Sequence, residues 1–454
     1  MSTLVVDGAW VVTMDGAGTE HEGGHVVVSD GRIAAVGPGG APEDVRREAD
    51  RVVDGAGCLL TPGLVNTHQH LYQWGTRGHA VDATLFQWLT ALYPVWAGID
   101  EETVRASAAA ALGWLARTGA TMSSDHHYVF PRGGGDVLAA TVSAAAEVGL
   151  RFHPTRGSMD LGASQGGLPP DGVVEEVDEV LAATEDAIER FHDPAPDAMV
   201  RVAVAPCSPF SVTGKLMVEA AALARRHGVL LHTHLAETSD EEDFCRERFH
   251  ASPTDYVESL GWLGADVWLA HAIHLSDRDI GRLAATGTGV AHCPSSNARL
   301  GAGIARLPEL RAAGVAVGLG VDGAASNEAG SMLEEARHAA LFARARRGPD
   351  ALAVRDALEL ATIGGARVLG RAEEVGSVVT GKLADLALWR VDTLPHAGIA
   401  DPVAALVLGS PPPLELLLVG GVPVVEHDHL VSTDEDRLAS DAAAAARRLR
   451  ERAP

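Results

Sequence analysis

The segment TPGLVNTHQH, residues 61–70, joins a short apolar run to two histidines that lie two positions apart. An Ala-rich segment with helical character follows at residues 103–119. A second apolar strand at 120–127 leads into another Ala-rich segment at 136–149. Such alternation of strand and helix is typical of a parallel sheet. The number of these units indicates whether the sheet stays open or closes into a barrel.

The strand–helix unit recurs from about residue 58 to residue 370. The further apolar runs are LRFHPTRGS (150–158), VRVAVAP (200–206), VLLHTHLAE (229–237), VWLAHAIH (267–274), GVAHCPSSN (289–297) and VAVGLGVDG (315–323). With the first two they give eight strands. Eight parallel strands linked by helices predict an α/β fold with a closed (β/α)8 barrel of the TIM type.

The two ends of the chain differ from this middle part and resemble each other. Both alternate short apolar runs with turn residues, and neither set of strands could bury a core alone. We therefore predict that residues 1–57 and 371–435 pair into one small β-sandwich domain. Residues 58–370 then form the barrel, and the Ala/Arg-rich residues 436–454 form a C-terminal surface helix.

Composition excludes some classes of function. The 454 residues include 36 basic and 61 acidic side chains, a net charge of −25, which disfavours binding to a nucleic acid polymer. No stretch of about 20 apolar residues is free of charge or proline, so no membrane span is expected. The N-terminus lacks a basic signal-peptide region, and the four cysteines are widely spaced. These features predict a cytoplasmic protein with reduced thiols.

Residues that bind metals or move protons lie at four predicted strand ends. They are His68 and His70, then His234 with Glu237, then His271, and finally Asp322. Catalytic side chains of barrel enzymes lie at the C-terminal ends of the strands. Two histidines at i and i+2 on a strand point the same way and make half of a divalent-metal site. One such pair arises easily by chance among 20 histidines, but four polar strand ends together predict a metal centre.

The order of these motifs resembles the amidohydrolase superfamily of metal-dependent hydrolases over nearly the whole chain. TPGLVNTHQH is similar to its PGxxxxHxH motif, and HTHLAE at 232–237 is similar to the HxxE element of its deaminase branch. The segment 291–327 resembles the last two barrel strands of that branch. The resemblance implies that His68, His70, His234 and Asp322 bind the metal, that Asp322 and Glu237 transfer protons, and that His271 hydrogen-bonds the water or the leaving group.

The chemistry expected of this set is hydrolytic. A divalent metal lowers the pKa of bound water towards about 7. Asp322 can accept the proton of that water, while Glu237 can protonate a ring nitrogen beside the attacked carbon. Collapse of the tetrahedral intermediate then releases ammonia or another leaving group. Together with this chemistry, the resemblance to the deaminase branch implies deamination of a purine- or pyrimidine-like N-heterocycle.

The chain contains only two lysines, Lys215 and Lys382. Binuclear members of the superfamily bridge their metals with a carboxylated lysine on the fourth strand, and the corresponding run at 200–206 has none. We therefore expect one metal ion. Zinc suits three nitrogens and a carboxylate, and Fe²⁺ is the alternative.

Substrate recognition is expected from the segment after the first strand. Trp88 is the candidate aromatic wall, Gln73 can donate to and accept from the amide edge of a ring, and Arg156 is a candidate partner for a carbonyl oxygen. A salt bridge at the barrel mouth is the alternative role for Arg156. The roles of His126, His127 and His232 stay open at this stage.

Within the superfamily, the segments HLYQ, LFQWLTALYPVW, SSDHHYVFP and RFHPTRGSMDLG resemble the 8-oxoguanine deaminase group, with triazine hydrolases as near relatives. Gln69 and His127 depart from that group's pattern. The alternatives are a triazine hydrolase that removes chloride or an alkylamine, and a non-catalytic barrel scaffold. A small heterocyclic substrate and a homodimer are the partners that the resemblance implies.

Overall fold

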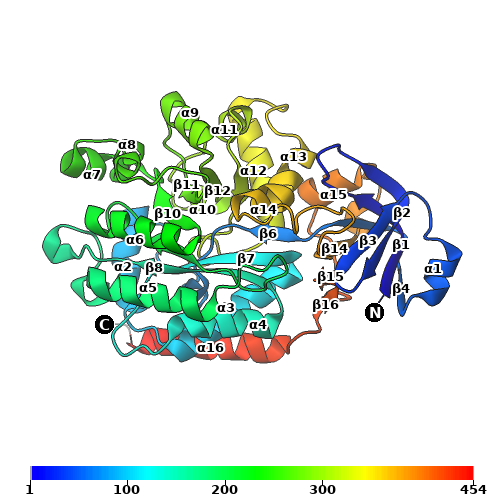
Figure 1. The fold of residues 1–454 in the computed structure, drawn as a ribbon, viewed down its shortest axis with the longest axis horizontal. Coiled ribbons are helices and arrows are strands. Elements are labelled where there is room, and N and C mark those ends of the chain that lie inside the picture. The colour runs from blue at the N-terminus through cyan, green and yellow to red at the C-terminus, as the bar shows by residue number, and fades with distance from the viewer. Residues whose placement is uncertain (1–2, 453–454) are drawn as a thin grey trace.

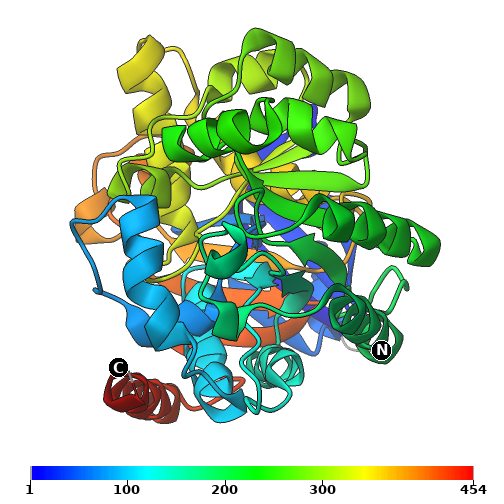
Figure 2. The same cartoon turned by 90° about the vertical axis from the view of Figure 1, so that its left-hand side faces the viewer.

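The computed structural model describes residues 3–452 and confirms the barrel (Figures 1 and 2). Eight parallel strands close on themselves in the order β10-β11-β12-β13-β6-β7-β8-β9. Their bounds are β6 Leu64–Asn66, β7 Ala120–His127, β8 Arg151–Ser158, β9 Ala203–Pro206, β10 Leu231–Leu235, β11 Val267–His271, β12 Gly289–His292 and β13 Val317–Leu319. Every residue of these strands is buried, as expected for parallel strands covered by helices.

Local sequence signals begin and end the helices around the barrel. Asp100 and Asp136 cap the N-termini of α3 and α4, and glycines in the left-handed region end α4, α6 and α9. The helices are α3 Glu101–Arg117, α4 Val137–Val148, α5 Val177–Phe191, α6 Gly214–His227, α7 Ser239–Phe249, α8 Pro253–Ser259, α9 Asp277–Thr286, α10 Pro294–Arg299, α11 Leu307–Ala312, α12 Met332–Arg347, α13 Val354–Glu359 and α14 Gly365–Val368. Among the described residues, the apolar core between these helices and the strands is continuous.

The two chain ends form one composite β-domain, as predicted. Its nine strands are hydrogen bonded in a single mixed sheet, in the order β17-β16-β15-β14-β5-β1-β2-β3, with β4 paired to β1. The bounds are β1 Thr3–Val12, β2 Glu20–Ser29, β3 Arg32–Gly37, β4 Arg51–Asp54, β5 Cys58–Pro62, β14 Leu386–Arg390, β15 Leu414–Val419, β16 Val422–Glu426 and β17 His429–Leu430. Alternate residues from both termini share one apolar cluster.

The domain boundaries at residues 57 and 370 stay predictions. Strand β5 pairs with β1 and β14 in the terminal sheet and leads directly into barrel strand β6. Two short helices, α1 Glu43–Glu48 and α15 Pro402–Leu408, complete this end of the molecule (Figure 1).

The C-terminal helix α16, Glu435–Arg452, lies along the side of the barrel against α3 (Figure 1). Its apolar face buries Leu438 and Leu449, and Arg117 of α3 binds the carboxylate of Glu435 at 2.7 Å. The predicted residues 453 and 454 of this helix lie outside the described residues. The helix therefore packs on the barrel through one face and leaves the other exposed.

Two further findings concern membrane-spanning helices and the state of the cysteines. Within residues 3–452, none of the helices combines the length and the apolarity that crossing a bilayer requires. All four cysteines are buried free thiols.

A buried ion pair joins the barrel to the terminal sheet. Arg151 at the start of β8 donates through Nε to Oδ2 of Asp385 at 2.7 Å and through Nη2 to Oδ1 at 3.1 Å. Asp385 directly precedes β14 and also accepts the backbone N–H of Gly420 at 2.7 Å. Both side chains are at most 2% exposed. The pair thus fixes the position of the sheet relative to the barrel floor.

Substitution Asp385→Ala should lower the free energy of unfolding by about 3–5 kcal/mol, because it leaves the Arg151 guanidinium buried without its counter-ion. Urea unfolding followed by circular dichroism measures the change. The control is Asp186→Ala, which removes an exposed helical ion pair with Arg190 and should cost no more than about 0.5 kcal/mol. Equal effects of the two substitutions would contradict the role given to Asp385.

Candidate active site at the barrel mouth

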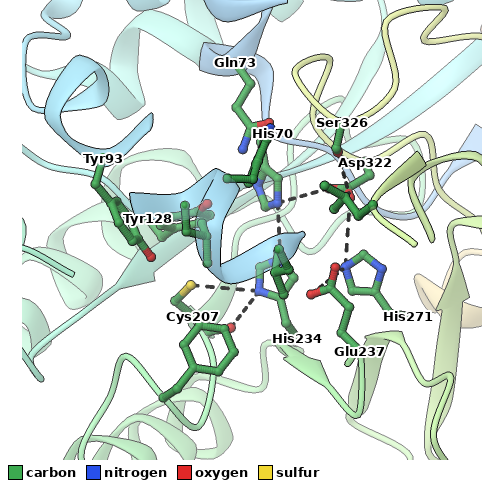
Figure 3. Close-up of a pocket in the computed structure, with 15 residues that line it drawn as sticks. His70, Gln73, Tyr93, Tyr128, Cys207, His234, Glu237, His271, Asp322 and Ser326 are labelled. Carbon is green, nitrogen blue, oxygen red and sulfur yellow. Dashed lines mark hydrogen bonds and ion pairs between the residues drawn. The ribbon is translucent and has the colours of Figure 1, made fainter. Parts of the chain in front are cut away.

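The six polar residues that the sequence singled out at strand ends lie together at the C-terminal ends of the strands, and all of them except His68 line one pocket (Figure 3). They are His68, His70, His234, Glu237, His271 and Asp322. His271 and Asp322 have backbone φ angles of 71° and 62°, and Ala236, beside Glu237, has 53°. Left-handed backbone at non-glycine residues is strained and occurs often at functional sites. The chain turns sharply at these strand ends and directs the side chains inward.

Two imidazoles, those of His68 and His70, lie against the carboxylate of Asp322. Its Oδ1 lies 3.4 Å from Nε2 of His68 and 3.2 Å from Nε2 of His70. Nε2 of His70 is also 3.1 Å from Nε2 of His234. These contacts link the four candidate ligands His68, Asp322, His70 and His234 into one continuous chain.

Hydrogen bonds on the far side of two of these rings fix their tautomers. Nδ1–H of His70 donates to the carbonyl of His126 at 2.7 Å, and Nδ1–H of His234 donates to the carbonyl of Cys207 at 2.7 Å. Burial keeps the His234 ring neutral, so its Nε2 carries a lone pair. This lone pair lies 3.1 Å from Nε2 of His70.

His232 fixes the tautomer of His68 in a similar way. Nδ1–H of His232 donates to the carbonyl of Trp268 at 2.9 Å, so its Nε2 accepts from Nδ1–H of His68 at 2.8 Å. The His232 ring also stacks on the Trp268 indole, with centroids 4.2 Å apart. His68 Nε2 is buried and has no hydrogen-bond partner. This is the arrangement that metal-binding histidines adopt, with a second group orienting each ring.

Burial and charge set the protonation of the cluster. Burial lowers the pKa of His68 and of His234 well below the usual range, so both rings are neutral. Burial acts to raise the pKa of Asp322, but the adjacent imidazoles of His68 and His70 hold it well below its usual range. Oδ2 of Asp322 also accepts from the hydroxyl of Ser296 at 2.6 Å. A set of neutral imidazoles and one carboxylate fits a divalent metal.

Glu237 and His271 stand beside this cluster on the same side as Asp322 (Figure 3). Nε2 of His271 is 3.7 Å from Oε2 of Glu237 and 4.0 Å from Oδ2 of Asp322, and its Nδ1 is fixed by Oδ1 of Asn297 at 2.9 Å. Burial, reinforced by the nearby charge of Asp322, raises the pKa of Glu237 well above its usual range. Glu237 is therefore suited to carry a proton at neutral pH.

The structure also places the two other histidines that were left open. His126 joins the cluster: two groups that could hold a metal are His68 with His126 and His234, and His68 with His271 and Asp322. Its Nε2–H donates to the carbonyl of Ala205 and its Nδ1 has no partner. His127 lies outside the cluster, where its Nε2–H donates to the carbonyl of Val129.

A small pocket opens above the cluster. One wall comes from helix α2, Leu85–Trp96, which presents Leu85, Trp88, Leu89 and Tyr93. These residues recur with the spacing of one helix face. Of these residues the sequence singled out Trp88 as the aromatic wall, although the apolar periodicity of LFQWLTALYPVW was the signal for the whole face. The other lining residues that it missed are Tyr128, Cys207, Phe210, Leu300 and Ser326.

Gln73 and Trp88 both line the pocket, and Arg156 does not. Gln73 lies in the short helix η1, Leu71–Thr76, and both polar atoms of its amide are buried without a partner. A Cβ at Gly323 would lie 1.8 Å from Gln73 Oε1, so only glycine leaves room for this amide.

Arg156 takes the structural role that was its alternative. Its Nη2 binds Oε1 of Glu175 at 2.7 Å, and its guanidinium lies over the ring of Phe130 at 3.5 Å from the centroid. The charge is therefore already paired, and the predicted contact of Arg156 with substrate has no support from this geometry.

Neither lysine lies at the site. Lys215 is on the exposed face of α6, 3.9 Å from Glu219, and Lys382 donates to the carbonyl of Ala372 near the terminal sheet. Strand β9, Ala203–Pro206, is built only of alanine, valine and proline.

Comparison with known proteins agrees with this geometry. The model of the amidohydrolase family matches residues 59–421. The chain is 46% identical over 400 residues to an 8-oxoguanine deaminase of Pseudomonas aeruginosa, covering 88% of each chain. It is 38% identical to a hydroxydechloroatrazine ethylaminohydrolase of Pseudomonas sp., covering 99% of this chain and 96% of the relative. The crystal structure of an atrazine chlorohydrolase from Arthrobacter aurescens complexed with zinc is 33% identical, with a TM-score of 0.92 over 98% of this chain and 100% of that one.

Substitution His232→Phe should weaken metal affinity by about 10- to 100-fold, because His68 loses the acceptor that fixes its tautomer. Competition with a chromophoric chelator measures the affinity. His127→Phe is the control and should leave it unchanged, since His127 bonds only to Val129. Loss of affinity in the control alone would refute this account of His232.

Proposed function

We propose that this chain, which belongs to the amidohydrolase family, hydrolyses the exocyclic amino group of an N-heterocycle of the 8-oxoguanine type and releases ammonia. The observation that carries the proposal is the placement of Glu237 beside His271 and Asp322, within one pocket that also contains the unpartnered amide of Gln73. A proton donor, a proton acceptor and a ring-edge partner are then available to one bound substrate.

The donor set fits one divalent metal held by His68, His70, His234 and Asp322. When bound, the metal supplies Lewis acidity that makes hydroxide available near neutral pH. Zinc is the preferred ion, because three imidazoles and a carboxylate suit it and a structural relative is complexed with zinc. A single ion is preferred because β9 carries no lysine that could bridge two.

The residues of the chain divide the proton transfers between them. Asp322 accepts the proton of the attacking water, since its pKa lies well below the usual range and it is ionised. Glu237, whose pKa is raised, protonates the ring nitrogen next to the attacked carbon. His271, oriented by Asn297, hydrogen-bonds the developing oxygen or the departing ammonia.

The pocket walls favour a flat and largely apolar ring. Trp88 is held by donation of its indole N–H to the carbonyl of Ala325 at 3.2 Å, so the face of the ring keeps its orientation. Gln73 offers both a donor and an acceptor, which an amide edge such as that of 8-oxoguanine requires. None of the fifteen lining residues is an arginine or a lysine. The site therefore suits a neutral heterocycle better than an anionic one.

A triazine hydrolase that removes chloride or an alkylamine is the second candidate. The observation in its favour is the structural likeness to the atrazine chlorohydrolase and the sequence likeness to the ethylaminohydrolase. The cytoplasmic location and the homodimer stay predictions from the sequence.

A panel of rings separates these candidates. The metal-loaded protein should release ammonia from 8-oxoguanine faster than from guanine, isocytosine, cytosine, pterins or aminotriazines. It should contain one zinc ion per chain by elemental analysis. Protein stripped of metal should be inactive and should recover with Zn²⁺. Release of chloride or alkylamine from s-triazines in preference to ammonia would favour the second candidate instead.

Substitution Glu237→Gln should lower kcat by about 100- to 10,000-fold while metal content stays at the wild-type level, because the proton donor is lost and the four ligands remain. Steady-state kinetics with elemental analysis checks both quantities. Full activity of this variant would show that another group delivers the proton.

A further inference from the structure

The carboxylate of Glu241 is fully buried near the site and has no part in the mechanism given above. Its Oε1 accepts the backbone N–H of Ala236 at 2.9 Å, and its Oε2 accepts the backbone N–H of Glu237 at 2.9 Å. Burying a carboxylate is costly unless hydrogen bonds compensate it. Both bonds go to the turn that carries the proton donor.

Helix capping does not explain these contacts. Glu241 is the third residue of α7, and Thr238 caps the helix by accepting the N–H of Glu241 at 3.4 Å. In a capping box the carboxylate at this position returns to the N–H of the cap residue itself. Here the carboxylate bonds instead to the two residues that precede Thr238.

The same turn is held from its other side. The carbonyl of Ala236 accepts the N–H groups of Ile273 and His274, both at 2.9 Å, from the loop that follows His271. Ala236 lies in the left-handed region with a φ of 53°, which an alanine does not adopt without support. Glu241 therefore holds the N–H side of a strained turn, while the His271 loop holds the carbonyl side.

We propose that Glu241 is a positioning residue that directs the side chain of Glu237 towards the ring nitrogen of the substrate. The inference rests on the deamination proposed above. Because a misplacement of about 1 Å can reduce a rate by about 100-fold, loss of either N–H contact should act on the chemical step. Substrate binding through Gln73 and metal binding through the histidines should be spared.

The test compares Glu241→Gln and Glu241→Ala with Glu242→Gln, a partly exposed neighbour in the same helical turn that is paired with Arg246. With 8-oxoguanine as the probe, Glu241→Ala should lower kcat by about 100-fold, with KM and metal content near the wild-type values. Glu241→Gln keeps one acceptor, so its kcat should lie between those of Glu241→Ala and the wild type. This variant still tests the proposal if Glu241→Ala does not fold. Glu242→Gln should match the wild type.

A double-mutant cycle gives the decisive readout. In a Glu237→Gln background, Glu241→Gln should cause little further loss of kcat, since the residue acts through Glu237. A full additional loss in that background would overturn the proposal. So would a loss confined to KM or to metal content.

Crystal structures separate this inference from the proposed function. If the wild type released no ammonia from any ring, the proposed deamination would be wrong. A displaced Glu237 carboxylate in Glu241→Ala, beside an unmoved one in Glu242→Gln, would still support the positioning role, and an unmoved Glu237 in both would refute it.

Discussion

Hydrogen bonds on the outer nitrogens of the barrel-mouth histidines set the chemistry of the whole site. The carbonyls of His126, Cys207 and Trp268 each accept from an Nδ1–H group, directly for His70 and His234 and through His232 for His68. Nε2 of His68 and of His70 then face Oδ1 of Asp322, and Nε2 of His70 also faces Nε2 of His234. These carbonyls belong to β7, β11 and the residue after β9, so barrel closure itself determines the polarity of the site.

The fold followed from the sequence because both of its parts are repetitive. Eight apolar runs with helices between them admit few topologies, and short strands at both termini need each other to bury a core. Pairing of the terminal strands in one continuous sheet could not be predicted, since β5 belongs to that sheet and yet runs straight into β6.

The candidate metal ligands could also be predicted from the sequence, because each stands at the end of an apolar run. Side chains that act by orienting another residue could not be predicted in this way. His232 has the same spacing as a ligand, and only its contacts with His68 and Trp268 reveal a supporting position. Arg156 does not line the pocket, and it pairs with Glu175, nineteen positions along the chain. Such pairings depend on loop paths that no local pattern records.

The left-handed backbone at Ala236, His271 and Asp322 has a consequence for how the chain tolerates change. Each strained residue stores conformational energy that the surrounding hydrogen bonds must offset, so the active geometry is held at the expense of global stability. Replacement of His271 or Asp322 by glycine relieves the strain and removes the chemistry together. Selection for heat resistance alone would therefore enrich inactive chains, and engineering of this barrel has to score turnover alongside melting temperature.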